Sequence, residues 1–354
     1  MIKKLIRQHL RAFEPYHSAR SEMDGLAGNR ELIYLDANEL ALGSPVPFSG
    51  IKLNRYPDPF QRQLRAAIGN RFSVAQDNVF VGVGSDEIID LLIRLFCEPA
   101  EDSVLILQPT YGVYGVSAAL NNIEQVDVQL DENFQIDVDK TLKALKKNTK
   151  IIFCCSPNNP TGNVLKKESI LKLAQSVDCM LVVDEAYAEF AEPGEVIQPR
   201  EIAKQENIII LKTLSKAWGS AGIRLGYCIA HREVVSYLLR IKAPYNINSV
   251  SSSLALEIIS LGDFKDSSVS IIQKEKERLA QALGSLNAVL KIYPSDANFI
   301  LAEFTDAKHY YDLLVWAGII VRRRSEPRLK NCLRITIGTP EENALLIQTL
   351  KEAE

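Results

Sequence analysis

The chain of 354 residues has few of the residues on which metal sites and disulfide frameworks depend. Its four histidines are scattered without zinc-ligand spacing, and its six cysteines include no CxxC pair. Most of the cysteines fall inside apolar segments that indicate strands or helices, which is typical of reduced, buried thiols in a cytoplasmic protein. We therefore expect no metal site, buried reduced cysteines and a cytoplasmic location.

A basic excess and a long apolar run are also absent. The formal net charge is −3, so the chain has no surplus of cations with which to neutralise a nucleic-acid backbone. No apolar run approaches the roughly 18 residues that a membrane-spanning helix needs. The N-terminal segment MIKKLIRQHLRAF interleaves charged and apolar residues, which indicates a short amphipathic helix rather than a secretion signal. Neither nucleic acid nor a membrane is an expected partner.

From about residue 70 onward, short apolar runs alternate with helical segments. These runs are continuous in Val, Ile and Leu, which is typical of strands covered on both faces. The pattern therefore predicts an α/β protein with a mostly parallel sheet and helices on both faces. The predicted strands are 78–84, 102–109, 149–157, 179–186 and 207–213, and the predicted helices include 85–99, buried nearly all round, and 166–177.

The pattern changes after about residue 250, where the C-terminal third indicates a smaller α+β domain. The residues Thr339, Pro340 and Glu342 predict a capping box that begins the last helix. The other predicted elements are a helix at 268–286, two strands joined by a PSD turn within 288–304, a helix at 307–318 and strands at 319–323 and 331–338. The predicted division is an N-terminal arm (1–35), a large domain (36–250) that starts with an irregular connection (36–60), and a small domain (251–354).

Polar residues follow several of the predicted strands. In a parallel sheet, the carboxyl ends of the strands meet at one edge, where ligands bind. Gly84, Ser85 and Asp86 begin a helix there, either as an anion site built from backbone amides or as a simple N-cap. The loop SPNNPTG contains Asn159, which has an amide donor that a tight turn does not require.

Two further strand ends carry charges. Asp184 ends an apolar strand, where desolvation disfavours its carboxylate unless a cation or donor is near; the alternative is an N-cap or a structural ion pair. Lys216 lies in TLSKAWGSAGIRLG just after another buried strand, and the alternative for it is a solvated loop lysine. Together with the anion cradle, these groups match pyridoxal phosphate, whose phosphate needs amides, hydroxyls and an arginine, whose ring nitrogen needs a carboxylate and whose aldehyde needs a lysine.

On these strings, the chain resembles the fold-type-I pyridoxal-phosphate-dependent aminotransferases of class II over nearly its whole length. The strings SPNNPTG, DEAY and SKAxxxAGIRLG carry the resemblance to the superfamily, and PYHSAR and LIRLFCEP favour its histidinol-phosphate branch. The fold that the resemblance implies is that of the fold-type-I transferases, with a large domain and a smaller C-terminal one. Other matching strings are LDANE, RYPDP, PTYGVY, APYNIN and LRITIGT.

The resemblance implies a role for each matching residue. Lys216 would form the Schiff base with the cofactor and move the proton between Cα and the cofactor's C4′. Asp184 would hold the ring nitrogen protonated, and Tyr187 would bond the ring hydroxyl together with Asn159. Tyr111 would stack on the ring. The residues implied for the phosphate are Gly84, Ser85, Asp86 (through its amide), Thr213, Ser215, Arg224 and, from a neighbouring subunit of a homodimer, Tyr56.

Substrate binding is implied for a second group of residues. Arg334 matches the family's arginine for the glutamate carboxylate, and its planar fork also suits a phosphate. Tyr16 and Arg322 are expected helpers, although the run Arg322–Arg324 taken alone indicates a solvated basic stretch. Asn38 lies in LDANEL, which departs from the family's LNANEN after Glu39 and leaves the details of substrate entry open.

The resemblance implies an amino-group exchange between L-histidinol phosphate and 2-oxoglutarate, which gives imidazole acetol phosphate and L-glutamate in histidine biosynthesis. Two alternatives share the same cofactor residues: an aminotransferase for aromatic or other amino acids, and a decarboxylase of phospho-amino acids. A cofactor-sensing regulator is not expected, because the stretch before the first strand is short and not basic enough for a DNA-binding segment.

Overall fold

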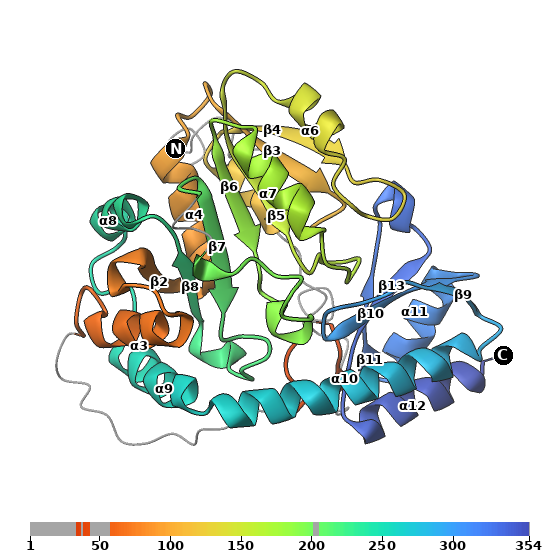
Figure 1. The fold of residues 1–354 in the computed structure, drawn as a ribbon. Coiled ribbons are helices and arrows are strands. Elements are labelled where there is room, and N and C mark those ends of the chain that lie inside the picture. Colours follow the sequence, from red (N-terminus) through yellow and green to blue (C-terminus); the bar gives the residue numbers. More distant parts are fainter. Residues whose placement is uncertain (1–32, 37, 43–56, 201–204, 354) are drawn as a thin grey trace, which may run out of the picture.

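The computed structural model describes residues 33–36, 38–42, 57–200 and 205–353, and its largest element is a seven-stranded sheet (Figure 1). The strand order is β2-β8-β7-β6-β5-β3-β4. The five strands predicted from the apolar runs are confirmed, and no end is shifted by more than two residues. The strands are β2 (Val79–Val83), β3 (Ser103–Gln108), β4 (Glu124–Gln129), β5 (Thr149–Cys155), β6 (Met180–Asp184), β7 (Ile208–Thr213) and β8 (Leu225–Ile229).

The sheet is mostly parallel, as predicted, with one reversed strand. β4, β3, β5, β6 and β7 pair in parallel, whereas β8 is antiparallel to both of its neighbours, β7 and β2. The connection from Thr213 to Leu225 contains only a 3-10 turn, Ala221–Ile223, and is too short for the helical crossover that a parallel strand requires. β8 was missed because its first two residues, Leu225 and Gly226, close the GIRLG string, and β4 because it is a polar edge strand, EQVDVQ.

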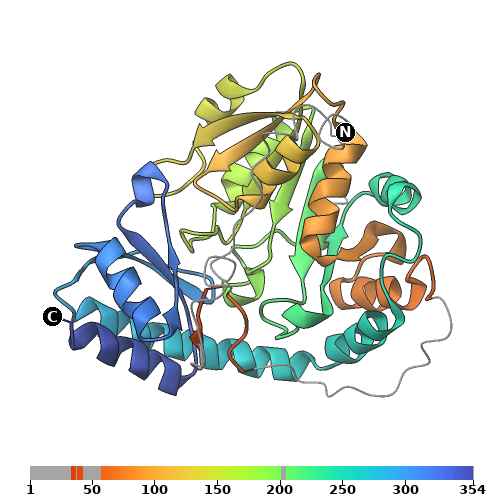
Figure 2. The same ribbon diagram turned by 180° about the vertical axis from the view of Figure 1, so that it is seen from behind.

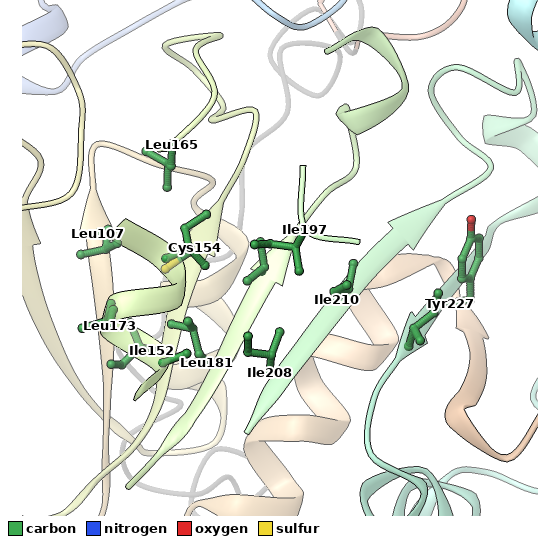
Figure 3. Packing of buried hydrophobic residues seen from close by; sticks show 14 of the residues in the cluster. Leu107, Ile152, Cys154, Leu165, Leu173, Leu181, Ile197, Ile208, Ile210 and Tyr227 are labelled. Atoms are coloured by element: carbon green, nitrogen blue, oxygen red, sulfur yellow. The ribbon is translucent and has the colours of Figure 1, made fainter. Parts of the chain in front are cut away.

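The side chains of the central strands alternate between two apolar cores. Ile152 and Cys154 of β5 pack on one face against Leu173 of α7 (Lys167–Gln175), as Figure 3 shows. Their neighbours Ile151 and Phe153 pack on the opposite face with α4 (Gly84–Phe96) and α5 (Val113–Leu120). Figures 1 and 2, which view the sheet from its two sides, show α7 and α4 covering opposite faces. This alternation follows from the two-residue period of a strand.

The remaining helices complete both layers. α3 and α9 lie on the α7 face, where Leu64, Ile68, Ala255 and Ile258 join its core, and α8 lies on the α4 face. Every residue of α4 except Arg94 is buried or half-buried, which confirms the expectation from its apolar surface. The bounds are α3 (Arg62–Phe72), α6 (Val138–Ala144), α8 (Arg232–Ile241) and α9 (Ser249–Ser260).

A second, four-stranded sheet lies beside the first and has a core of its own. Its order is β12-β13-β10-β9, and the antiparallel pair β9–β10 confirms the predicted PSD turn. The capping box of Thr339 and Glu342 is also confirmed. The elements are β9 (Val289–Ile292), β10 (Phe299–Phe304), β12 (Arg322–Arg323), β13 (Cys332–Thr336), α11 (Ala307–Trp316) and α12 (Pro340–Lys351).

Two predictions for this region were wrong in detail. The segment predicted as one strand at 319–323 forms β11 (Ile319–Ile320) and β12, because β11 leaves the small sheet to pair in parallel with β1 (Ile33–Tyr34). The helix α10 begins at Gly262 rather than at residue 268, and runs to Gly284. Leu261 is the single residue between α9 and α10. The two helices follow one another closely in Figure 1.

The segment from 33 to 42 belongs to the core of the small sheet, although it lies far away in sequence. Leu35 and Leu40 pack in the same cluster as Phe299 and Ile335. The predicted domain boundaries at 35/36 and 250/251 stay predictions. All six cysteines are buried and unpaired. Among the described residues, we find no helix with the length and apolar character to cross a bilayer.

Replacement of Gly226 by Ala tests the close packing of β8 against the start of α4. A Cβ at Gly226 would lie 2.4 Å from the backbone C of Gly84 and the backbone N of Ser85, which cannot move independently of the sheet. We expect Gly226→Ala to lower the free energy of unfolding in urea by about 1–3 kcal/mol. Gly222→Ala is the matched control, because a Cβ there meets no atom within 4 Å. Equal stability of the two variants would contradict this packing.

Candidate active site

A cavity of about 210 Å³ lies where the carboxyl ends of the large sheet's strands face the small sheet. It collects side chains from the start of α4, from the segments after β3, β5, β6 and β7, and from the small sheet. Its lining residues are Asp36, Asn38, Gly84, Ser85, Asp86, Tyr111, Cys155, Asn159, Asp184, Ala186, Tyr187, Thr213, Ser215, Lys216, Arg224, Arg322 and Arg334.

The cavity brings together every site residue predicted from the sequence that the structure describes. The predicted residues Tyr16 and Tyr56 lie outside the described residues. Three lining residues were not predicted: Asp36, Cys155 and Ala186. Each of them ends a strand or lies within two residues of a strand end. Their position at the carboxyl ends of strands could therefore have predicted them.

One end of the cavity is suited to an anion. It is formed by the N-terminus of α4, whose 13 residues contribute a positive dipole end and first-turn amides that have no partner within the helix. Gly84, the first residue, has φ of +72°, a conformation that suits glycine. The guanidinium of Arg224 donates to Asp86 Oδ2 at 3.2 Å, and the hydroxyl of Tyr111 donates to Asp86 Oδ1 at 3.2 Å.

Two hydroxyls extend this end of the cavity. Thr213 Oγ1 accepts the backbone N–H of Ser215 at 3.1 Å and lies 2.9 Å from Ser215 Oγ. Both residues are buried, and both line the cavity. Amides, hydroxyls and a guanidinium in one place are the donors that a phosphate group requires.

Asp184 is a buried carboxylate with a fixed orientation. Its Oδ2 accepts the hydroxyl of Tyr114 at 2.7 Å, and its Oδ1 accepts the backbone N–H of Ala186 at 3.1 Å. Burial raises the pKa of Asp184 to about 6, and these two donors oppose that rise. Such a group gains stability from a cationic or N–H partner in the cavity.

Tyr114 is a residue that sequence reasoning missed. It is fully buried, and its ring stacks on Phe153 with centroids 4.8 Å apart and meets Tyr111 edge-on at 5.6 Å. The spacing between Tyr111 and Tyr114 places them on one side of the start of α5, and this was the available signal.

Lys216 follows β7 and faces the cavity. Burial, and after it the nearby guanidinium of Arg334, lower the pKa of its ammonium to about 8. Its Nζ lies 5.7 Å from the centre of the Tyr187 ring. An amine with this pKa is partly neutral near pH 8, and can act as a nucleophile or a base.

The hydroxyl of Tyr187 accepts two hydrogen bonds. It accepts the side-chain amide of Asn38 at 3.0 Å and that of Asn159 at 3.3 Å. Asn159 in turn accepts a hydrogen bond from Arg334, whose other terminal nitrogen donates to the backbone oxygen of Asp36 at 2.6 Å. The phenol thus connects the large sheet to the small one.

Two arginines lie side by side on the small sheet. Arg322 and Arg334 are direct partners across the β12–β13 pair, and both line the cavity. Like charges opposite each other destabilise a sheet unless an anion lies between them. Of the neighbours of Arg322, only Arg323 is exposed, as expected for a solvated basic stretch; Arg324 is largely buried and pairs with Glu326 outside the cavity.

The chain belongs to the class I and II aminotransferases, whose family model matches residues 47–350. It is 45% identical to a histidinol-phosphate aminotransferase from Flavobacterium johnsoniae, across 99% of this chain and 98% of that protein. A histidinol-phosphate aminotransferase from Clostridium acetobutylicum has the same fold, with a TM-score of 0.82, 25% identity and coverage of 90% of this chain and 98% of that one. An enzyme of that name from Sinorhizobium meliloti, solved with pyridoxal-5′-phosphate, has a TM-score of 0.87 at 20% identity, with 99% and 98% coverage.

Replacement of Arg334 by Met tests the electrostatic coupling to Lys216. Because the guanidinium disfavours the ammonium, its removal should raise the pKa of Lys216 from about 8 toward its ordinary 10.5. We expect a rise of about one unit. The pKa can be read from the pH dependence of acylation of Lys216 in the cofactor-free protein, followed by peptide mass spectrometry.

Arg328→Met is the control for that change, because Arg328 binds the backbone oxygens of Leu130 and Asp131 and does not line the cavity. Its midpoint should equal that of the unmodified protein. An unchanged midpoint in Arg334→Met would show that burial alone sets the pKa of Lys216.

Proposed function

We propose that this enzyme transfers the amino group of L-histidinol phosphate to 2-oxoglutarate with pyridoxal phosphate as its cofactor, as a step of histidine biosynthesis. The observation that carries the proposal is a single cavity with two separate anion sites, one at α4 and Arg224 and one at Arg334 and Arg322. A reaction that joins a phosphorylated cofactor to an anionic substrate needs both. The names and the identity of the curated relatives support the same substrate.

The donor set fits pyridoxal phosphate. The hydroxyl and amide donors near Ser85, Ser215 and Arg224 would hold its phosphate, and the carboxylate of Asp184 would hold its ring nitrogen. Tyr111 would lie against the ring, and Tyr187 with Asn159 would bond its hydroxyl oxygen. When bound, the cofactor supplies an aldehyde for the amino group and an electron-withdrawing ring.

The protein's own residues carry out the proton transfers. The lowered pKa of Lys216 makes its amine a competent base at neutral to mildly alkaline pH, so it can take the Cα proton of the substrate and return it at C4′ of the cofactor. Asp184 stays oriented by Tyr114 and Ala186 and favours a protonated ring nitrogen. Asp184 is almost fully buried, which strengthens the electrostatic interactions of its carboxylate.

The two arginines of the small sheet account for both substrates of the proposal. The planar guanidinium of Arg334 can bind a carboxylate of glutamate or 2-oxoglutarate with two hydrogen bonds, or the phosphate of histidinol phosphate. Arg322 adds a second positive charge, which favours the doubly charged phosphate. Tyr16 and Asn38 are further substrate residues in the proposal; Tyr16 lies outside the described residues.

The direct test is an absorbance spectrum of the cofactor-loaded protein before and after addition of histidinol phosphate. We expect the band of the lysine-bound cofactor to give way to that of the pyridoxamine form, and 2-oxoglutarate to restore it. Lys216→Ala should lower kcat by about 10⁴-fold or more, because it removes the base. Lys166→Ala is the control, because Lys166 is exposed and lies away from the cavity.

A panel of amino donors separates the alternatives. A higher kcat/KM for phenylalanine or tyrosine than for histidinol phosphate would identify an aromatic aminotransferase instead. Release of CO₂ from a phospho-amino acid without any keto acid would identify a decarboxylase. Either result would overturn the substrate named above, while the cofactor assignment would stand.

We also propose that the enzyme is a cytoplasmic homodimer in which Tyr56 contributes to the neighbouring cofactor site. Three exposed apolar side chains support a subunit contact: Phe60 (41%), Val83 (39%) and Tyr245 (42%). Their segments are joined by hydrogen bonds among Gln61, Asn246 and Glu87. Val83 adjoins the cavity residue Gly84, so this patch lies at the edge of the site. The six unpaired, buried cysteines support a reducing compartment.

Replacement of Tyr245 by Asp tests the dimer. A charge in a buried apolar contact is costly, so we expect Tyr245→Asp to shift the protein from dimer to monomer in sedimentation velocity. Trp316→Asp is the control: Trp316 is 76% exposed on α11, and its replacement should leave the dimer intact. A monomeric unmodified protein, or an unchanged dimer in Tyr245→Asp, would contradict this assignment of the contact.

A further inference from the structure

Asn38 forms hydrogen bonds with Thr336 of the small sheet and with the hydroxyl of Tyr187, which follows β6 of the large sheet. It is 1% exposed, and its backbone has φ of 53°, in the left-handed region. Its backbone N–H donates to Thr336 Oγ1 at 3.0 Å, and its backbone oxygen accepts the side-chain amide of Asn298 at 2.9 Å. Its side chain lies between Thr336 and Tyr187.

The hydrogen bonds determine which way each group donates. Thr336 is buried and already accepts the N–H of Asn38, so its own proton needs an acceptor, which Asn38 Oδ1 provides at 2.9 Å. The Asn38 amide therefore turns its Nδ2 toward the hydroxyl of Tyr187. On the other side, the guanidinium of Arg334 can only donate, so Asn159 uses Oδ1 for Arg334 and Nδ2 for Tyr187.

Both lone pairs of the Tyr187 oxygen are thus occupied by amide donors, and its own proton must point elsewhere. A phenol oxygen has one proton and accepts two hydrogen bonds. Because Tyr187 lines the cavity, the remaining direction for its O–H is into the cavity. Thr336 and Arg334 lie two residues apart on β13, hence on one face of the strand, and each reaches this oxygen through one asparagine.

We propose that Asn38 and Thr336 form a positioning pair that fixes the Tyr187 hydroxyl as a hydrogen-bond donor toward the cofactor. Tyr187 also accepts a hydrogen bond from Asn159, which Arg334 orients. A substrate anion that binds Arg334 can break the hydrogen bond between Arg334 and Asn159. Because the hydrogen bonds from Thr336 through Asn38 to Tyr187 do not involve Arg334, the Tyr187 hydroxyl keeps donating into the cavity when the substrate binds. This inference rests on the proposed function, because it assigns the acceptor in the cavity to the ring oxygen of pyridoxal phosphate.

The test uses cofactor-loaded protein without an amino donor. A donor at the ring oxygen favours its anionic form, so it lowers the pH at which the lysine-bound cofactor changes its visible absorbance. Thr336→Val keeps the shape of the side chain but removes the hydroxyl, which leaves the Asn38 amide free to turn over. We expect its absorbance midpoint to rise by about half a pH unit or more, a threefold change in proton affinity.

A second variant and a double-mutant cycle isolate the effect. Asn38→Leu, which removes the amide, should shift the midpoint in the same direction. In a Tyr187→Phe background, neither change should move the midpoint further, because the donor they orient is gone. Thr141→Val is the matched control: it removes another buried hydroxyl, bonded to the backbone of Asp137, and should leave the midpoint unchanged.

The outcomes are distinguishable. Midpoints equal to that of the unmodified protein in both Thr336→Val and Asn38→Leu would overturn the positioning pair. Equal shifts with and without the Tyr187 hydroxyl would also overturn it, since they would mean a general disturbance of the site. Failure of the unmodified protein to develop a pH-dependent visible band would instead contradict the proposed cofactor.

Discussion

The site depends on charged groups that are held at the ends of buried, mostly apolar strands of the large sheet. Asp184 ends β6 and Lys216 follows β7, and both strands are almost entirely buried, so each charge is costly unless the surrounding groups stabilise it. The structure meets this constraint by placing donors on the carboxylate and by keeping the lysine partly neutral. The same desolvation that costs stability makes these groups reactive, which is typical of catalytic sites.

Much of the large sheet could be predicted because its strands are continuous apolar runs. β5, β6 and β7 lie close to the residues predicted for them, and the rule that ligands bind at the carboxyl ends of parallel strands correctly predicted that Asn159, Asp184 and Lys216 lie together. β4 and β8 could not be found in this way. The first is a polar edge strand, and the second has a direction determined by the length of the preceding connection.

The hydrogen-bond network behind the site was not predictable from spacing alone. Tyr114 reaches Asp184 across 70 positions of the sequence, and Thr336 reaches Asn38 across 298. Such contacts depend on how the two sheets lie against each other. Arg322 illustrates the point: the sequence predicted it as a substrate residue, but its place directly opposite Arg334 follows only from the pairing of β12 with β13.

The link between α9 and α10 has a mechanical consequence. α10 has 23 residues, so it is a stiff rod about 35 Å long that carries the small sheet at its far end. Leu261, at its near end, is the one non-helical residue before it, with ψ of 47°. A bend of about 5° at Leu261 would displace the far end of such a rod by about 3 Å. The backbone torsions of this one leucine therefore set the direction in which α10 leaves α9, and with it the place of the small sheet that packs on α10.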